Sequence, residues 1–342
     1  MLRERLPKDA QGRTYVDSFL LSHPDADHCR GLARHFHLGK PDDWKKDDDK
    51  VFIREMWSSP IIFRRSSELD GELCDDANAW WTEARRRVAK YRENKNTVKD
   101  GDRIQILGAD VDGKTDDLAD IKVDIDGTIE KICGQKDNTF KGLLLAPLPS
   151  ADKDEEEALK KNHSSVVIRF HIKAGSVEDA CAYLTGGDAE VAIWERLWKR
   201  HKKTTSDLTY DVLLTPHHCS WHTLSYDSWS DMGEDAKVAP DARSALSQAN
   251  DKAIIVASSK EIKNDEDDPP CIRAKREYDE IVKDVSGQFL CTATDGKDDV
   301  ILIEIDSTGP AKKAAGGGAV GGGSSSGKKP GQVEKKGGGR YA

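Results

Sequence analysis

The segment LLSHPDADHCRGL, residues 20–32, decides the fold, because it places two histidines and two aspartates within six positions directly after an apolar run. These four side chains are His23, Asp25, Asp27 and His28. The preceding residues 16–22 (VDSFLLS) are predicted to form a buried strand. Taken alone, the segment has two interpretations, a metal site or a polar loop that happens to hold histidines.

The composition is that of a folded protein with a highly charged surface. The chain has 342 residues, of which 37% are hydrophobic and 34% are charged, and its net charge is −9. The acidic balance argues mildly against tight binding of duplex DNA and leaves a local basic groove open. No apolar run approaches the roughly 20 residues of a membrane helix, and the start does not read as a signal peptide. With seven dispersed cysteines and no CxxC pair, we expect reduced thiols and a cytoplasmic location.

Strands alternate with helices along the chain, which predicts an α/β fold. Further strands are expected at 102–108, 142–148, 164–172, 181–186, 210–216, 252–258 and 299–305, and helices at 76–93, 189–201 and 271–284. We expect one domain over residues 1–310, with charged surface insertions at about 40–50 and 109–140. Residues 311–342 are rich in Gly, Ser and Lys and are predicted to be disordered. This tail is either a solubilising segment or a weak tether for nucleic acid or a partner.

Other polar residues also follow predicted strands. Asp188 follows 181–186, the pair His217 and His218 follows 210–216, and Asp268 follows 252–258. Strand ends in α/β folds bring their loops to one edge, where binding sites form. Imidazole and carboxylate groups are ligands of zinc, a bridging carboxylate can join two metals, and an additional carboxylate shifts the preference toward manganese. The pattern therefore predicts a centre for two divalent metal ions, Zn or Mn.

The motif H-P-D-A-D-H followed by C-R-G-L resembles the HxHxDH signature of the metallo-β-lactamase fold, with Asp25 in place of the middle histidine. This form is similar to the hydrolase domain of ComEC-type DNA-uptake proteins. Later segments resemble successive blocks of the family in order: APLP (146–149), NHSSVVIRF (162–170), YLTGGDAE (183–190), LLTPHHCS (213–220), ASSKEIKNDEDDPP (257–270) and TATDGKDDVILIEI (292–305). The resemblance spans about residues 16–305 and implies an αββα sandwich with metal-dependent hydrolase activity.

Position by position, the resemblance implies a role for each motif residue. His23 and Asp25 would bind one metal, and Asp27 and His28 would serve the second, with Asp27 also able to orient the attacking water. Asp188 would bridge the two metals. A hydroxide on the metal would be the nucleophile, because a dication lowers the pKa of bound water toward neutrality.

Two later histidines and one aspartate complete the predicted site. The resemblance implies that His217 and His218 supply a ligand or an acid near the leaving group, with His217 favoured as the more direct participant. The family's N-x-x-G-H-P block is altered at 264–269, so that Asp268 stands where a histidine belongs. Asp268 is either a carboxylate ligand or part of an acidic surface loop. His163 stands near the position of another family histidine and is interpreted as a solvated loop residue.

Only fifteen residues precede 16–22, so we expect the opening strand hairpin of the family to be absent, leaving an unpaired sheet edge. Three explanations stay open: a misassigned start, a truncated version of the protein, or a partner chain that completes the sheet. The leading functional hypothesis is hydrolysis of phosphoester bonds in nucleic acid or nucleotides. A second is hydrolysis of a carboxylic ester, lactone or β-lactam on the same centre. A third is a degenerate member that acts as a non-catalytic binding module.

Overall fold

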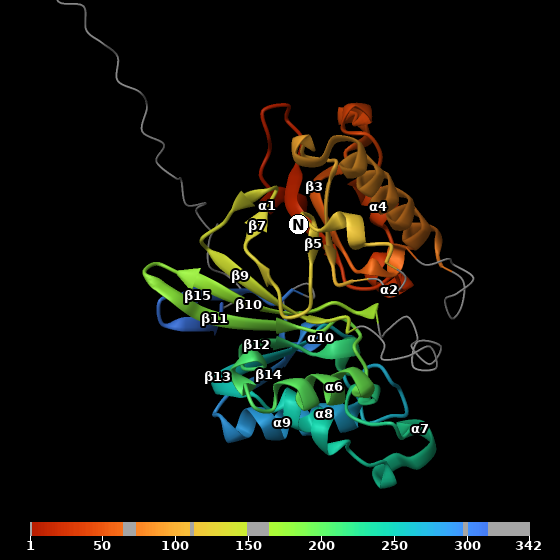
Figure 1. Ribbon diagram of the computed structural model, residues 1–342. Helices are drawn as coiled ribbons and strands as arrows, with labels where there is room; N and C mark the ends of the chain where they lie inside the picture. The colour runs from red at the N-terminus through yellow and green to blue at the C-terminus, as the bar shows by residue number, and fades with distance from the viewer. Residues whose placement is uncertain (1, 64–72, 110–112, 149–163, 297–299, 314–342) are drawn as a thin grey trace, which may run out of the picture.

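The computed structural model describes residues 2–63, 73–109, 113–148, 164–296 and 300–313. The protein is a mixed α/β structure with two β-sheets lying between helices (Figure 1). Residues 314–342 of the predicted tail and His163 lie outside the described residues.

The first sheet is parallel and holds the opening motif at one edge. Its strand order is β1-β3-β4-β5, with β2 also paired to β3. The bounds are β1 Tyr15–Leu21, β2 Phe36–His37, β3 Val51–Ser58, β4 Arg103–Leu107 and β5 Lys122–Val123. Among the described residues, β1 pairs with β3 alone. The described chain before β1 contains helix α1 (Leu2–Arg5) and an isolated bridge between Lys8 and Thr14.

The second sheet is mixed, with the order β14-β13-β12-β11-β10-β9-β6. The strands β11 to β14 are parallel to one another, and β10, β9 and β6 continue the sheet with antiparallel pairings. The bounds are β6 Thr128–Ile129, β9 Phe140–Ala146, β10 Val167–Ala174, β11 Val177–Thr185, β12 Tyr210–Leu214, β13 Ala249–Ala257 and β14 Gln288–Cys291. Two small hairpins join β7 Lys131–Ile132 to β8 Gln135–Lys136 and β15 Ile303–Asp306 to β16 Gly309–Lys312.

Helices cover the outer face of each sheet. On the first sheet, α4 (Asp75–Asn94) buries Trp80, Ala84 and Val88, as their four-residue spacing predicts. The second sheet carries α6 (Val191–His201), α8 (Pro240–Leu246) and α9 (Ile272–Asp284) on the face away from the first sheet (Figure 1). The short helices are α2 Ala26–Cys29, α3 Leu32–His35, α7 Trp229–Met232 and α10 Thr292–Asp295. No helix in the described chain has the length and apolar character needed to cross a membrane.

Part of the core lies between the two sheets. Trp57 of β3 and Leu107 of β4 pack in one buried cluster with Leu144 of β9 and Ile168 of β10. Apolar burial of this kind contributes about 25 cal/mol per Å². The cluster therefore holds the two sheets together and fixes the edge where their loops meet.

The predicted strands and helices are largely confirmed, with differences in three segments. The strand predicted at 299–305 is seen as β15, which begins at Ile303. Residues 311–312 belong to β16, so the predicted tail begins inside a strand. The segment 109–140 is more than a surface insertion, because β5 and β6 extend the two sheets and Leu118 and Ile129 are fully buried. Its many charges obscure these short apolar contacts in the sequence.

Candidate metal centre

The polar loops meet at the carboxyl ends of strands from both sheets. Strands β11 and β12 are parallel and pair Thr185 with Leu214, so that Asp188 and His217 each follow three residues later at the same edge. The first sheet reaches this edge through β1, where the Ser22 carbonyl accepts a hydrogen bond from the backbone N–H of Val166 at 3.2 Å. Segments that are far apart in sequence are thus brought together.

The motif loop is anchored from behind by helix α4. Asp76 accepts hydrogen bonds from the backbone N–H groups of Gly31 and Ala33, both at 2.8 Å. Gly31 adopts a left-handed conformation (φ 89°), which glycine tolerates without steric cost. Cys29 is buried in the core beneath the loop. With its rear side fixed in this way, the loop directs His23 and His28 toward Asp188.

Asp188 lies at the middle of the centre, and its two oxygens face different histidines. Oδ1 is 2.9 Å from His28 Nε2 and 3.9 Å from His218 Nε2. Oδ2 is 3.3 Å from His23 Nε2 and 3.8 Å from His217 Nε2. The carboxylate therefore separates an outer group (Asp27, His28 and His218) from an inner group (His23, Asp25 and His217). A carboxylate placed between two donor sets is the arrangement that can bridge two cations.

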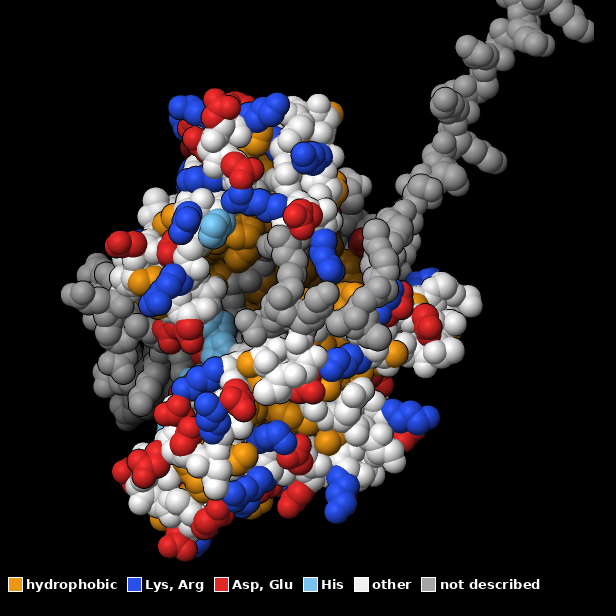
Figure 2. Space-filling view, turned by 180° about the vertical axis from the view of Figure 1, so that it is seen from behind, with side chains coloured by type: hydrophobic (Ala, Val, Ile, Leu, Met, Phe, Trp, Pro, Cys, Tyr) orange, Lys and Arg blue, Asp and Glu red, His pale blue; other side chains and the backbone are white. Residues whose placement is uncertain are grey.

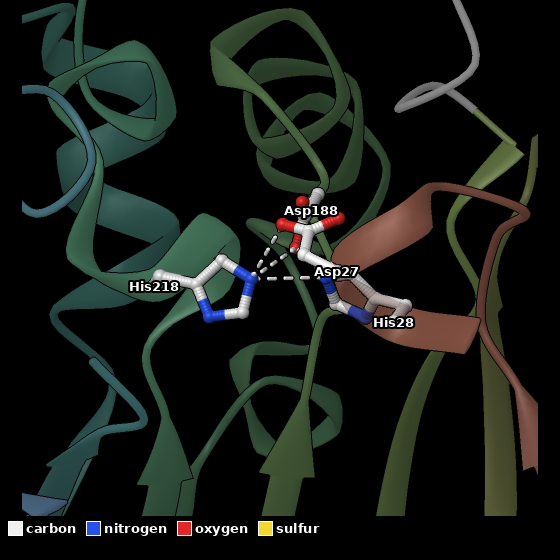
Figure 3. A group of neighbouring side chains, drawn as sticks. All are labelled: Asp27, His28, Asp188 and His218. Atoms are coloured by element: carbon white, nitrogen blue, oxygen red, sulfur yellow. Dashed lines mark hydrogen bonds and ion pairs between the residues drawn. The ribbon is translucent and has the colours of Figure 1, made fainter. Parts of the chain in front are cut away.

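The outer group is tightly gathered (Figure 3). One ligand atom from each of Asp27, His28, Asp188 and His218 lies within 4.8 Å of the others. His218 Nε2 is 3.0 Å from His28 Nε2 and 3.3 Å from Asp27 Oδ2. His218 Nδ1 donates to the Ser258 carbonyl at 2.8 Å, so in the neutral ring the Nε2 lone pair points into the group. Two imidazoles and two carboxylates form a donor set that suits a divalent cation.

In the inner group, His23 is buried, whereas Asp25 and His217 are half-buried. The His23 side chain is fully buried, and its Nε2 has no hydrogen-bond partner within the described structure. Nδ1 of the same ring is hydrogen-bonded to Ser22 Oγ at 3.1 Å. His23 Nε2 lies 3.8 Å from Asp25 Oδ2. A partner on Nδ1 that leaves Nε2 unpaired is typical of a metal-ligating histidine. Within the described residues, however, the ligand atoms that lie within 4.8 Å of one another are those of Asp27, His28, Asp188 and His218.

The HH segment has an unusual backbone. His217, His218 and Cys219 are consecutive residues with positive φ, at 49°, 53° and 72°. For residues other than glycine, this region costs about 1–2 kcal/mol each. The segment is held by a hydrogen bond from His217 N–H to the Gly187 carbonyl at 2.9 Å. Such strain persists where surrounding structure enforces it and is concentrated at functional sites.

The backbone of the turn before Asp188 is also restricted in its conformation. Gly187 has φ 50°, and a Cβ atom there would lie 2.9 Å from the Cβ of Ser22. The following backbone N–H of Asp188 donates to Ser165 Oγ at 3.0 Å. These contacts fix the carboxylate of Asp188 between the two groups of histidines.

The charges of the centre perturb two groups. Burial by itself raises the pKa of Asp188, but the close contacts with His23 and His28 and their charges outweigh it and hold this pKa well below its ordinary value. Burial lowers the pKa of His28, whereas the hydrogen bond to Asp188 and the nearby carboxylates raise it, and the net pKa is above its ordinary value. The centre therefore attracts positive charge, which a proton or a metal ion can supply.

Six of the seven predicted ligands come together, and Asp268 does not join them. Asp268 Oδ1 accepts from the backbone N–H of Trp221 at 3.0 Å, and Oδ2 lies 3.9 Å from His222 Nε2. The structure thus gives Asp268 a role in shaping the loop after the HH pair. His218 belongs to the tight outer group, whereas sequence analysis favours His217 as the more direct participant.

Sequence reasoning did not find the residues that orient the ligands. Ser22, Ser165 and Gly187 position His23 and Asp188. Ser22 adjoins the motif and Gly187 adjoins Asp188, so adjacency to a ligand was the available signal.

No family model, no curated protein and no solved structure matches the chain.

Proposed function

We propose that the protein is a metal-dependent hydrolase of phosphoester bonds with two divalent cations, Zn or Mn, and an αββα fold of the ComEC-like metallo-β-lactamase type. The observation that carries the proposal is Asp188, whose oxygens face separate groups of histidines and carboxylates. His23, Asp25 and His217 would hold one cation, and Asp27, His28 and His218 the other, with Asp188 shared. Bound cations would lower the pKa of a water molecule and stabilise negative charge on the phosphoryl group.

The charge of the centre suits an anionic substrate once both cations are present. Asp25, Asp27 and Asp188 contribute −3 and two divalent cations contribute +4, which leaves +1. Without cations, three clustered carboxylates would repel a phosphate group. This balance favours phosphoesters over neutral esters and lactones, and the resemblance to ComEC-type domains suggests nucleic acid or nucleotides among them.

The side chains of the centre would have separate roles in hydrolysis. In hydrolysis, water adds to phosphorus, the bond from phosphorus to the leaving oxygen breaks, and the proton of the water must be accepted. Asp27 is the most exposed carboxylate of the outer group, with 58% of its side chain accessible, so we assign it to orienting the water and accepting its proton. His217 and His218 would supply a ligand to a cation or the proton that the leaving oxygen takes up, as the resemblance implies. Asp268 would shape the loop beside them.

A substitution of Asp188 tests the proposal. Asp188→Asn keeps the size of the side chain but removes its charge, so we expect both metals to be lost and turnover of bis-4-nitrophenyl phosphate to fall by more than ~10²-fold. Asp207→Asn is a matched control, because Asp207 also contacts a histidine, His201, outside the centre. Metal content is measured by elemental analysis after supplementation with Mn²⁺ or Zn²⁺.

Three results would contradict the proposal in different ways. Wild-type turnover by Asp188→Asn would exclude this centre as the catalytic site. Faster hydrolysis of nitrocefin than of the phosphodiester would favour the ester, lactone or β-lactam alternative. A wild-type metal content below about 0.2 per chain would favour a non-catalytic binding module.

Two further expectations belong to the same proposal. Among the described strands β1 pairs with β3 alone, and its other edge would accept a protein partner that adds a strand to the first sheet. The cysteines are all free thiols, and a reducing compartment such as the cytoplasm is the proposed location.

A further inference from the structure

An apolar cavity of about 320 Å³ lies against the second sheet, on the face opposite α6, α8 and α9. Its floor is formed by β11, β12 and β13, through side chains that include Tyr183, Val212 and Val256. Its roof includes Ile303 and Ile305 of the β15–β16 hairpin. The volume is within the range of small-molecule sites, roughly 300–1,000 Å³.

Strand alternation explains why this face is apolar. Val212 and Leu214 of β12 line the cavity, whereas Leu213 between them packs into the cluster beneath the helices. On β13, Val256 lines the cavity and its neighbour Ile255 faces the helices. Strands buried on both faces have continuous apolar sequences. Here one of these faces is covered incompletely by a short hairpin.

The cavity reaches the candidate metal centre at the carboxyl ends of these strands. Ser258 lines the cavity and is exposed, and its carbonyl accepts the hydrogen bond from His218 Nδ1 at 2.8 Å. Leu214 lines the cavity three residues before His217. Seen from behind, hydrophobic side chains are visible in a hollow at the middle of the molecule, with histidine side chains beside it (Figure 2). Ser258 therefore contacts both the cavity and His218 of the outer group.

We propose that this cavity binds an aliphatic group of the substrate, so that the centre acts on phosphoesters that carry an alkyl or acyl chain. This inference rests on the proposed function. Among the described residues, no charged side chain lines the cavity, and two of its hydroxyl-bearing residues, Ser258 and Thr292, stand toward the end near the centre. A nucleotide base would bury N–H and C=O groups against Ile and Val side chains, where unpaired polar groups are costly. An alkyl chain has no such groups to satisfy.

The test compares ligands that differ in chain length alone. Hexylphosphonate and methylphosphonate cannot be hydrolysed, and their dissociation constants for the Mn²⁺-supplemented full chain are measured by calorimetry. Burial of each methylene is worth up to about fourfold in affinity, so we expect hexylphosphonate to bind at least ~10-fold more tightly. Val212→Trp fills the cavity and should remove this advantage while changing the affinity for methylphosphonate by less than about twofold.

Val177→Trp is the matched control, because it makes the same substitution at an exposed position of β11 in the same sheet. It should leave the preference for hexylphosphonate unchanged. If Val212→Trp fails to fold, as judged by circular dichroism, Leu214→Phe makes a smaller change at a partly exposed position of the same wall.

The outcomes separate this inference from the proposed function. Equal affinity for the two phosphonates, or a preference that persists in the filled variant, would overturn the aliphatic site. Tighter binding of thymidine 5′-phosphonate than of hexylphosphonate would overturn it in favour of a nucleotide. Hydrolysis of methyl 4-nitrophenyl phosphate without a gain for the hexyl ester leaves the catalytic proposal intact and rejects the cavity. A preference for hexylphosphonate without hydrolysis of either ester supports the cavity and rejects the catalytic proposal.

Discussion

The two groups on either side of Asp188 differ in burial and in how they are held. In the inner group, the His23 side chain is fully buried and its ring is oriented by Ser22. In the outer group, Asp27 is 58% exposed and His218 is oriented by the Ser258 carbonyl. The left-handed segment that carries His218 also carries His217 of the inner group. The inner group thus contains a ring that is fixed by packing, whereas the outer group contains a carboxylate that faces the solvent, from which a substrate would arrive. Under the proposed function, the inner group would hold the cation farther from the solvent, and the outer group would hold the cation that meets the substrate.

Substituting one histidine in each group should give the largest effect and should show how the inner and outer groups differ. We expect His23→Ala and His28→Ala each to reduce the metal content from about two to about one per chain and to lower phosphodiesterase activity by more than ~10²-fold. They should differ in stability. His23→Ala leaves a buried cavity and should lower the free energy of unfolding by about 1–3 kcal/mol, whereas His28→Ala, at a partly exposed position, should lower it less. Elemental analysis and thermal unfolding measure the two effects. Equal melting temperatures for the two variants would contradict a packed inner group.

Ser22 offers a smaller perturbation of the inner group. Ser22→Ala removes the hydrogen bond to His23 Nδ1 and leaves the ligand itself in place. Loss of such a partner costs about 10–100-fold in metal affinity, so we expect one of two binding steps to weaken and the other to stay unchanged in a metal titration. Ser244→Ala is the control, because its hydroxyl donates to the Pro240 carbonyl within α8, outside the centre. Weakening of both steps would show that the two groups are not independent.

The sequence predicted most of the secondary structure and most of the candidate ligands, because both depend on local patterns. The apolar run before His23 and the spacing of Trp80, Ala84 and Val88 each reflect one element and its burial. The convergence of Asp188 with the histidines followed from a general rule, that the loops after parallel strands share one edge of a sheet. The central strand β3 (VFIREMWS) was missed, although its residues are almost all buried.

What escaped prediction depends on contacts between distant residues. The distinction between the inner and outer groups arises from the orientation of one carboxylate relative to four rings, which spacing along the chain does not encode. Asp268 follows a strand as the candidate ligands do, yet its carboxylate accepts a hydrogen bond from the backbone N–H of Trp221. The cavity beside the centre depends on how far the β15–β16 hairpin covers the second sheet.

The smallest expected effect concerns protonation of the outer group in metal-free protein. The pKa of His28 is raised by Asp188, so protonated His28 stabilises the fold fully below its unfolded pKa of about 6.5, and this contribution is lost as pH rises through the folded pKa. The pKa of Asp188 is lowered, so its share is present above about pH 3.9 and is lost only in stronger acid.

The chelated protein should therefore melt a few degrees lower at pH 8 than at pH 6, the change that about 1 kcal/mol gives in a protein of this size. In His28→Gln the side chain cannot be protonated, so the difference between the two pH values should be smaller. Metal replaces the proton in the loaded protein, where raising the pH should instead strengthen binding and increase stability. An equal decrease in the chelated wild type and in His28→Gln would show that protonation of the outer group does not contribute to the stability of the fold.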